Sequence, residues 1–302
     1  MKRLLFTLAT CCVMCACEQK TEMNPFFTEF QTEYGAPDFT KIRLEHYEPA
    51  FLKGIEEQNA EIKAIVDNPE EPTFENTIVA LDKSGGILAR VSGVFFALTE
   101  ADTNDSLTAL NEKMAPVLSE HSDNIYLNQD LYKRVADVHQ QEREGKITLT
   151  TEQHRLLDKY YKAFVRSGAG LDAGKQSRFR AINKELSTLG IAFDNHILNE
   201  NNAYQLVIEN EADLAGLPEW VKAGAAEEAK AAGKEGKWLF TLQNSSRLPF
   251  LQYAENRELR KNIYEAYINR GNHDDANDNK EILGKIMALR LEQAKLLGFD
   301  CY

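Results

Sequence analysis

The chain has 302 residues, with 35 basic and 47 acidic side chains, and its formal net charge is −12. Hydrophobic residues make up 43% of the chain, which is enough to fill a core and excludes a wholly disordered protein. The negative charge and the lack of a lysine and arginine cluster disfavour nucleic acid as a partner, because phosphate binding needs such clusters.

The N-terminal residues have the features of an export signal. Lys2 and Arg3 precede an apolar stretch that is shorter than the ~20 residues of a transmembrane helix. Residues 1–16 are therefore predicted to be a signal peptide rather than a membrane span. Four of the five cysteines lie within the first seventeen residues, so a disulfide framework in the body of the protein is excluded.

The residues around Cys17 resemble a bacterial lipoprotein cleavage box, in which alanine precedes the cysteine. This predicts Cys17 as the lipid-modified first residue of the mature protein, while cleavage at Cys15 or by an ordinary signal peptidase stays open. Without Lys2 and Arg3 the charge becomes 33 − 47 = −14. We expect an exported protein of the periplasm or cell envelope that contacts a membrane only through its lipid anchor.

Residues 17–40 are predicted to form an extended N-terminal arm, since prolines and glycines interrupt any helical period after residue 23. The aromatic side chains of the arm are expected to pin it onto a helical body. They are Phe26, Phe27, Phe30 and Phe39.

Helical periodicity dominates residues 41–200, with apolar residues three and four positions apart. We expect the apolar faces of these helices to lie in the core. The predicted helices span residues 46–67, 73–100, 107–118, 131–138, 150–164 and 179–197. Gly85 and Gly86 are expected to bend or break the second of these, and Gly168 to end the fifth.

Two segments depart from the helical pattern. Residues 204–209 and 237–243 are rich in β-branched and aromatic residues and predict two short strands, joined through an alanine-rich helix at 219–232. Helices at 257–270 and 278–297 follow, the second with Gly298 as its C′ residue. The sequence therefore predicts a mainly α fold with a small β-ribbon.

A search for metal sites finds no complete motif. None of the six histidines begins a His-Glu-x-x-His motif, and His154 and Asp158, at i and i+4, are interpreted as a surface pair. The acidic run 273–279 is similar to a calcium loop, but Lys280 and Ile286 occupy the positions that need glycine and glutamate. We interpret this run as a solvated loop that provides the N-cap of the next helix.

Other catalytic motifs are also incomplete. Residues 170–176 resemble a phosphate loop, but three residues instead of four separate the glycines, and Gln176 stands where serine or threonine should be. Cys301 has no recognisable histidine partner, and abundant acidic residues do not by themselves define a paired-carboxylate site. On these residues alone, the protein is an exported α-helical protein without a visible active site.

Several segments, in order along the chain, resemble bacterial peptidyl-dipeptidases of the thimet oligopeptidase family. The likeness covers essentially the whole chain after the signal. It is carried by residues 24–26, 37–39, 46–51, 72–78, 94–96, 124–128, 238–240, 256–260 and 296–299.

The resemblance implies a mostly helical zinc peptidase with a deep channel between two lobes, which admits short oligopeptides and releases dipeptides from their C-termini. It implies that residues 41–200 form a helical N-terminal lobe and one channel wall. Residues 201–244 then form the β-ribbon and its connecting helix, and residues 245–302 begin a catalytic domain that looks truncated at Tyr302. The zinc helix of the family follows the segment that ends this chain, so no catalytic, zinc-binding or substrate-contact residue is assigned.

Two hypotheses follow from these observations. In the first, the chain is the N-terminal part of an exported zinc peptidyl-dipeptidase and is inactive alone, with an endo-acting oligopeptidase as a related possibility. In the second, it is a non-catalytic helical lipoprotein that binds peptides or a protein partner. Zn²⁺ is the cofactor implied for the first, and neither hypothesis fixes an oligomeric state.

Overall fold

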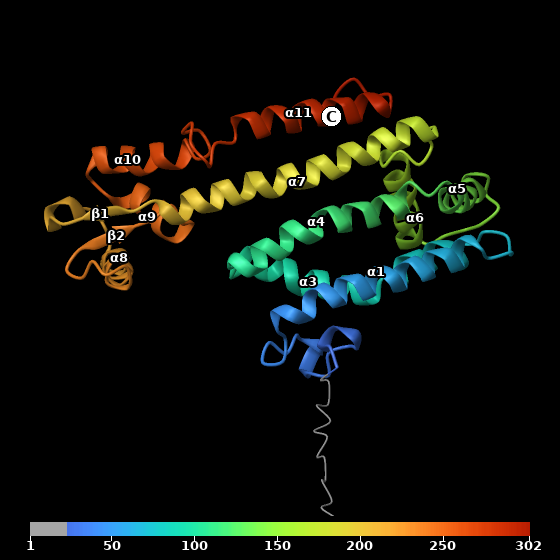
Figure 1. Ribbon diagram of the computed structural model, residues 1–302, viewed down its shortest axis with the longest axis horizontal. Coiled ribbons are helices and arrows are strands. Elements are labelled where there is room, and N and C mark those ends of the chain that lie inside the picture. Colours follow the sequence, from blue (N-terminus) through green and yellow to red (C-terminus); the bar gives the residue numbers. More distant parts are fainter. Residues whose placement is uncertain (1–22) are drawn as a thin grey trace, which may run out of the picture.

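The computed structural model describes residues 23–302, and this part of the chain is mainly α-helical (Figure 1). Strands β1 (Leu206–Ile208) and β2 (Trp238–Phe240) form a two-stranded sheet, so the predicted fold class is confirmed. The α-helices are α1 (Leu44–Val66), α2 (Ala80–Lys83), α3 (Gly86–Ala101), α4 (Asp105–Tyr126), α5 (Gln129–Arg143), α6 (Thr151–Arg166), α7 (Ala173–Ala203), α8 (Glu219–Ala231), α9 (Asn244–Tyr253), α10 (Arg257–Ile268) and α11 (Lys280–Leu296).

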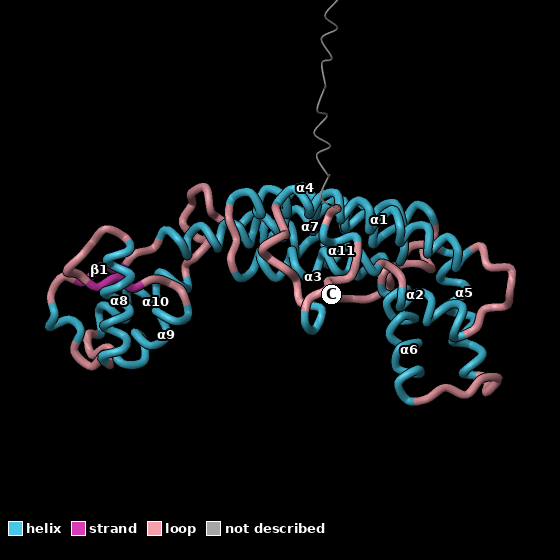
Figure 2. Tube along the Cα trace, turned by 90° about the horizontal axis from the view of Figure 1, so that it is seen from below, coloured by secondary structure: helices cyan, strands magenta, loops and turns pink. Residues whose placement is uncertain are grey.

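The long helices α1, α4, α7 and α11 lie side by side in that order, and α3 packs against α1 (Figure 1). The hairpin of α5 and α6 lies at one end of this elongated layer, and the strands with α8, α9 and α10 lie at the other (Figure 2). Helix α7 therefore connects the helical layer with the unit that contains the sheet. Among the described residues, every helix is too short or too polar to cross a bilayer.

An aromatic cluster holds α1, α3 and the N-terminal arm together. Phe51 on α1 and Phe95 on α3 are fully buried, with their ring centroids 5.3 Å apart. Burying a side chain of this size stabilises the fold by ~1.5–3 kcal/mol. Phe26 anchors the arm, since it is also fully buried and its carbonyl oxygen accepts a hydrogen bond from Arg90 Nη1 at 2.8 Å.

The prediction for the arm is only partly confirmed. Phe30 packs edge-on against Phe26, with ring centroids 6.0 Å apart, but Phe27 and Phe39 are exposed. Of these four rings, Phe26 is the one that is fully buried in the aromatic cluster, and Phe30 packs partly buried against it.

The predicted helix over residues 73–100 consists of three elements. Thr73 caps a π-helix (Phe74–Val79) through its hydroxyl oxygen, which accepts from the Asn76 N–H at 3.0 Å, and Asn76 Oδ1 accepts from the Thr73 N–H at 2.8 Å. This capping box joins the helix start to the loop before it. Helix α2 follows, and the expected break occurs at Gly85, whose φ is +76°.

Buried Arg134 on α5 fixes the start of this π-helix. Its guanidinium donates to the carbonyl oxygen of Asn68 at 3.0 Å and to Asn76 Oδ1 at 3.2 Å. The apolar core beneath it contains Leu131, Val135 and Val138, all fully buried. The face predicted for the helix over 131–138 is thereby confirmed as a core face.

His121 on α4 is a buried imidazole that faces Gln58 on α1. It is 5% exposed, and its Nε2 lies 2.7 Å from Gln58 Oε1. Its Nδ1 has no hydrogen-bond partner among the described residues. Burial lowers the pKa of His121, because the charged imidazolium would lose its hydration.

We expect the stability of the fold to fall as the pH drops below the ordinary histidine pKa of ~6.5. The pKa of His121 is lower in the folded than in the unfolded chain, so the unfolded chain takes up the proton first. This group can remove up to ~1.4 kcal/mol of unfolding free energy per pH unit. Urea titrations of the parent and of His121→Gln at pH ~7.5 and ~5.5, about one unit on either side of the ordinary histidine pKa, measure this effect. The variant should lose less free energy of unfolding than the parent between the two pH values. Equal losses would contradict the assignment.

The sheet unit closes on its own core at the end of α7. Strands β1 and β2 pair antiparallel with Val207 opposite Leu239, and α8 connects them as predicted. Phe240 on β2 packs against Phe250 on α9, with ring centroids 4.5 Å apart. Arg247 on α9 stacks 3.5 Å over the Tyr267 ring of α10. Helix α9 was not among the predicted elements.

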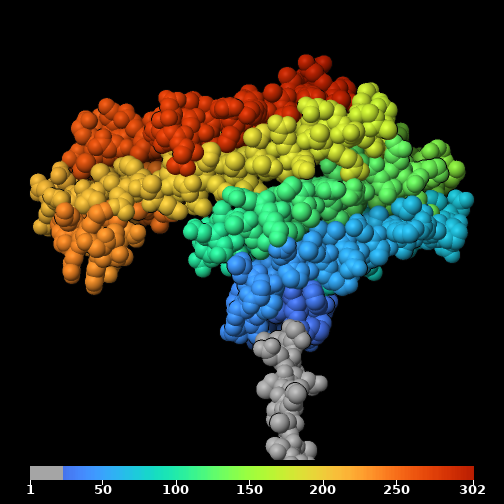
Figure 3. Space-filling view, in the orientation of Figure 1, coloured from blue at the N-terminus to red at the C-terminus, as the bar shows by residue number. Residues whose placement is uncertain are grey.

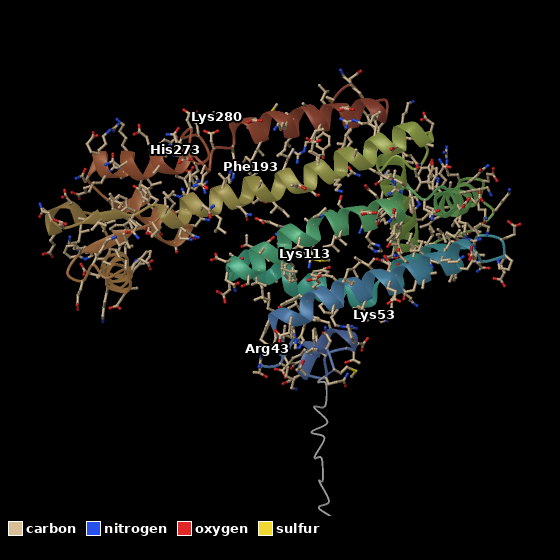
Figure 4. The ribbon with its side chains drawn as sticks, in the orientation of Figure 1. Arg43, Lys53, Lys113, Phe193, His273 and Lys280 are labelled. Atoms are coloured by element: carbon tan, nitrogen blue, oxygen red, sulfur yellow. The ribbon has the colours of Figure 1, made fainter. Side chains whose placement is uncertain are left out.

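The loop between α10 and α11 fastens α11 to α7. Asn279 is 4% exposed; its Oδ1 lies 2.9 Å from His196 Nδ1, and its Nδ2 donates to the Phe193 carbonyl oxygen at 3.1 Å. Figure 4 shows Phe193 on α7 below this loop, with His273 in it and Lys280 where α11 begins. Glu200 on α7 lies 3.5 Å from His273.

The prediction that this loop is solvated and provides an N-cap needs a correction. Asn279 occupies the N-cap position of α11 but makes no capping hydrogen bond, because its side chain is turned inward to α7. Asp278 instead accepts from the Lys280 N–H at 2.9 Å. Helix α11 ends as predicted, with Gly298 at φ +85°.

Candidate functional site

A recess opens beneath α7, between the turn that joins α3 to α4 and the protruding helix α8 (Figure 3). Helix α7 spans it, so residues on α7 and on the α3–α4 turn face the same space. We call the hollow between this turn, α4 and α7 the α4–α7 groove. It consists of two adjoining hollows of about 630 and 430 Å³ that share Thr103, Thr108, Asn195 and Leu198.

Polar contacts fix both walls of the groove. Asn104 caps α4, since its side chain accepts hydrogen bonds from the backbone N–H groups of Ser106 and Leu107. Across the groove, Asn195 Nδ2 on α7 donates to Glu112 Oε1 on α4 at 2.7 Å. The groove is therefore held by secondary structure on both sides, which limits the entropy lost when a ligand binds.

The floor of the larger hollow is apolar. Phe96 from α3 is 38% exposed, and Leu118 from α4 and Ile191 and Leu198 from α7 are half-buried. Of these, Leu118 was expected to lie in the core, on the predicted helix over residues 107–118. On α7 only Phe179 and Ile182 are fully buried. Helix α4 packs on one side of α7 and α11 on another, and Ile191 and Leu198 remain partly exposed to the groove.

The groove carries negative charge. Glu100 and Asp194 line the larger hollow, and Asp105 and Glu112 line the smaller one. Among the described residues that line either hollow there is no lysine or arginine. Desolvation raises the pKa of Asp194 above its ordinary value, which places this carboxyl next to the apolar floor.

Helix α8 borders the other side of the recess. Trp220 is 63% exposed and lines a hollow of about 300 Å³ between α8, β2 and the start of α9. Helix α8 thus provides an exposed aromatic ring in addition to the α4–α7 groove.

His154 and Asp158, the pair that the sequence placed at i and i+4, bind different partners. His154 Nδ1 lies 2.8 Å from Glu142 Oε1 on α5, whereas Asp158 forms an ion pair with Lys162 at 2.7 Å. Both interactions are at the protein surface, so the interpretation of His154 as a surface side chain is confirmed, but its partner is Glu142. Within residues 23–302, no group of three or more histidine, cysteine, aspartate or glutamate side chains is placed to hold a metal ion.

The remaining sequence candidates are the segment similar to a phosphate loop, Cys301 and Cys17. Asp172, in the segment similar to a phosphate loop, caps α7 by accepting from the Lys175 N–H at 3.0 Å. Cys301 is exposed and free. Cys17, the predicted lipid attachment site, lies outside the described residues.

The sequence did not predict the groove, because the period of one helix does not show which of its faces a neighbouring helix leaves open. A signal was nevertheless present in the charge pattern. Residues 91–112 contain four acidic residues and residues 185–203 contain three, and neither segment contains lysine or arginine. These two segments supply the opposite walls of the groove.

The chain is similar to known peptidases. Residues 250–302 match the family model described as Peptidase family M3. Over 282 residues the chain is 40% identical to the dipeptidyl carboxypeptidase of Escherichia coli strain K12, a match that covers 93% of this chain and 41% of that protein.

Two further relatives show the same pattern. Oligopeptidase A of Escherichia coli strain K12 is 33% identical over 285 residues, which cover 92% of this chain and 41% of that protein. The thimet-like oligopeptidase of Dictyostelium discoideum is 26% identical over 258 residues, which cover 85% and 37%. The chain thus spans about two-fifths of the length of the curated relatives it matches.

Proposed function

We propose that this chain, which belongs to peptidase family M3, forms one wall of the peptide channel of a metallopeptidase that releases dipeptides from the C-termini of oligopeptides. The observation that carries the proposal is the 40% identity to a dipeptidyl carboxypeptidase over 282 residues. The lower identity to oligopeptidase A, 33%, favours dipeptide release over endo-acting cleavage.

The geometry of the recess supports this assignment. A channel that admits extended peptides needs a long surface with apolar patches and polar groups at its sides. The α4–α7 groove provides an apolar floor with polar walls, and Trp220 on α8 provides an exposed aromatic ring. We assign the α4–α7 groove and Trp220 to peptide binding.

An exposed apolar row on α11 also supports the proposal. Leu283, Met287 and Leu291 lie four residues apart and are 48%, 65% and 41% exposed. They belong to the segment that matches the peptidase family model. Rows of this kind are contact surfaces, and we propose that further parts of a catalytic domain cover this one.

Family M3 peptidases are generally zinc-dependent, and the described residues do not fit a zinc site. Zinc has a preferred set of three or four histidine, cysteine or carboxylate ligands, and the titratable side chains of the groove are not arranged in such a set. No catalytic step is therefore assigned to residues of this chain.

Dipeptide release is the expected activity of the full-length gene product. Incubated with an oligopeptide blocked at its N-terminus and free at its C-terminus, it should release the C-terminal dipeptide first, and removal of the metal with a chelator should abolish this. Mass spectrometry of the products at successive times is the measurement. Internal cleavage would indicate an endo-acting oligopeptidase, and a metal-free protein that binds the peptide uncut would favour the non-catalytic alternative.

We also propose that the protein is exported and anchored to a membrane through a lipid on Cys17. The support is the basic pair, the short apolar stretch and the alanine before Cys17. In cells, Cys17→Ala is expected to move the protein from the membrane fraction to the soluble fraction without reducing its amount, as shown by fractionation. Cys301→Ala provides the matched control; continued membrane association of Cys17→Ala would contradict the proposal.

A further inference from the structure

We propose that the α4–α7 groove binds the N-terminal part of oligopeptide substrates and selects those that carry positive charge beside apolar side chains. This inference rests on the proposed function, because it assigns the groove to a substrate of that activity. It adds a specificity surface to residues for which neither the sequence motifs nor the comparisons provide a role.

The apolar floor makes the groove a docking surface. Phe96 and the half-buried Leu118, Ile191 and Leu198 present carbon surface to solvent at the junction of three helices. The hollow of about 630 Å³ has room for one or two apolar side chains of an extended peptide. Its walls are fixed by the hydrogen bond between Asn195 and Glu112, so the surface is formed before a ligand arrives.

Charge complementarity identifies the occupant. Glu100 and Asp194 lie beside the apolar floor, and the described residues that line the groove include no lysine or arginine to neutralise them. Neither carboxylate has a hydrogen-bond or ion-pair partner among the described residues. An ammonium or guanidinium group bound in the groove would gain Coulomb energy from these carboxylates, whereas a further carboxylate would be repelled.

The same charges determine which end of the peptide fits. A free C-terminal carboxylate would be repelled by the carboxylates of the groove, whereas the residues that precede the released dipeptide do not carry this terminal charge. The groove is therefore available to the residues that precede the scissile bond. The N-terminal ammonium or the lysine and arginine side chains of this part supply the positive charge.

Two blocked tetrapeptides test the inference without requiring catalysis. One alternates lysine with leucine and the other alternates glutamate with leucine; both are acetylated and amidated, so that they differ only in side-chain charge. Calorimetric titration of the chain is expected to give at least tenfold tighter binding of the lysine peptide. Raising the ionic strength from about 0.05 to about 0.3 M should weaken this binding, because salt screens exposed charges.

Paired variants locate the binding site. Glu100→Gln with Asp194→Asn is expected to weaken binding of the lysine peptide by on the order of tenfold. The matched control is Glu71→Gln with Glu75→Gln, which removes the same charge from exposed side chains that follow the C-terminal end of α1 and do not line the groove. It should leave the affinity unchanged. Circular dichroism confirms that both variants fold.

Three results would overturn the inference. These are equal binding of the two peptides, no binding of the lysine peptide, or equal weakening by the groove variant and the control. None of them bears on dipeptide release by the full-length gene product, so the proposed function and this inference can fail separately.

Discussion

Gly54→Ala is expected to lower the free energy of unfolding by about 2 kcal/mol, although alanine is the better helix former. Gly54 lies on α1 where this helix crosses α3, and it is buried. A β-carbon at this position would lie 2.7 Å from the backbone nitrogen of Leu88 and 2.9 Å from its Cα. Backbone atoms of a helix cannot rotate away, so the two helices must separate and the aromatic cluster between them must loosen.

Gly93→Ala on α3 is the matched control for this prediction. Gly93 also lies inside a helix, but a β-carbon there would meet no atom within 4 Å. Alanine should therefore stabilise the chain by about 0.5–1 kcal/mol through helix propensity alone. Urea titrations followed by circular dichroism measure both variants, and a Gly54→Ala chain as stable as Gly93→Ala would show that the helices do not approach this closely.

Helices whose apolar residues form one continuous buried stripe were predictable from the sequence. Leu131, Val135 and Val138 repeat at three and four residues and form one buried stripe on α5. The capping box at Thr150 likewise marks the start of α6, where Thr150 Oγ1 accepts from the Gln153 N–H at 3.3 Å. In both helices the local pattern and the tertiary packing agree.

Helix α9 could not be predicted in this way, because packing overrides its local preferences. Its residues include Asn244, two serines and Pro249, which favour loops and turns. The helix forms because Phe250 is fully buried against Phe240 and because Arg247 stacks on Tyr267, a residue twenty positions further along the chain. Contacts of this kind leave no periodic signal in one segment.

The candidate groove shows the same limit for function. Periodicity assigned Leu118 on α4 to a core face, but it could not show whether a neighbouring helix covers this side chain. That depends on the spacing of α4 and α11 around α7. What could be found from the sequence is the absence of basic residues from 91–112 and 185–203, and only the fold brings these two segments together.

Gly216→Ala is expected to destabilise the sheet unit by about 3 kcal/mol, from backbone strain and a direct clash. Gly216 has a φ of +84°, and a β-carbon there would lie 2.3 Å from the carbonyl oxygen of Tyr253. The neighbouring Ala215 carbonyl accepts from the Glu255 N–H at 2.9 Å. This hydrogen bond joins the turn before α8 to the segment between α9 and α10. If the substitution separates these two backbone segments, the core around Phe240 and Phe250 should open.

Gly236→Ala separates the two contributions to this effect. Gly236 has nearly the same φ, +83°, but a β-carbon there would meet nothing within 4 Å. It should therefore show the strain alone, about 1–2 kcal/mol. Amide hydrogen exchange of residues 204–267 is the measurement, since the loss of protection in Gly216→Ala should be confined to this unit while α1 to α6 stay protected. Equal protection in the two variants would mean that the turn at Gly216 does not hold the unit closed.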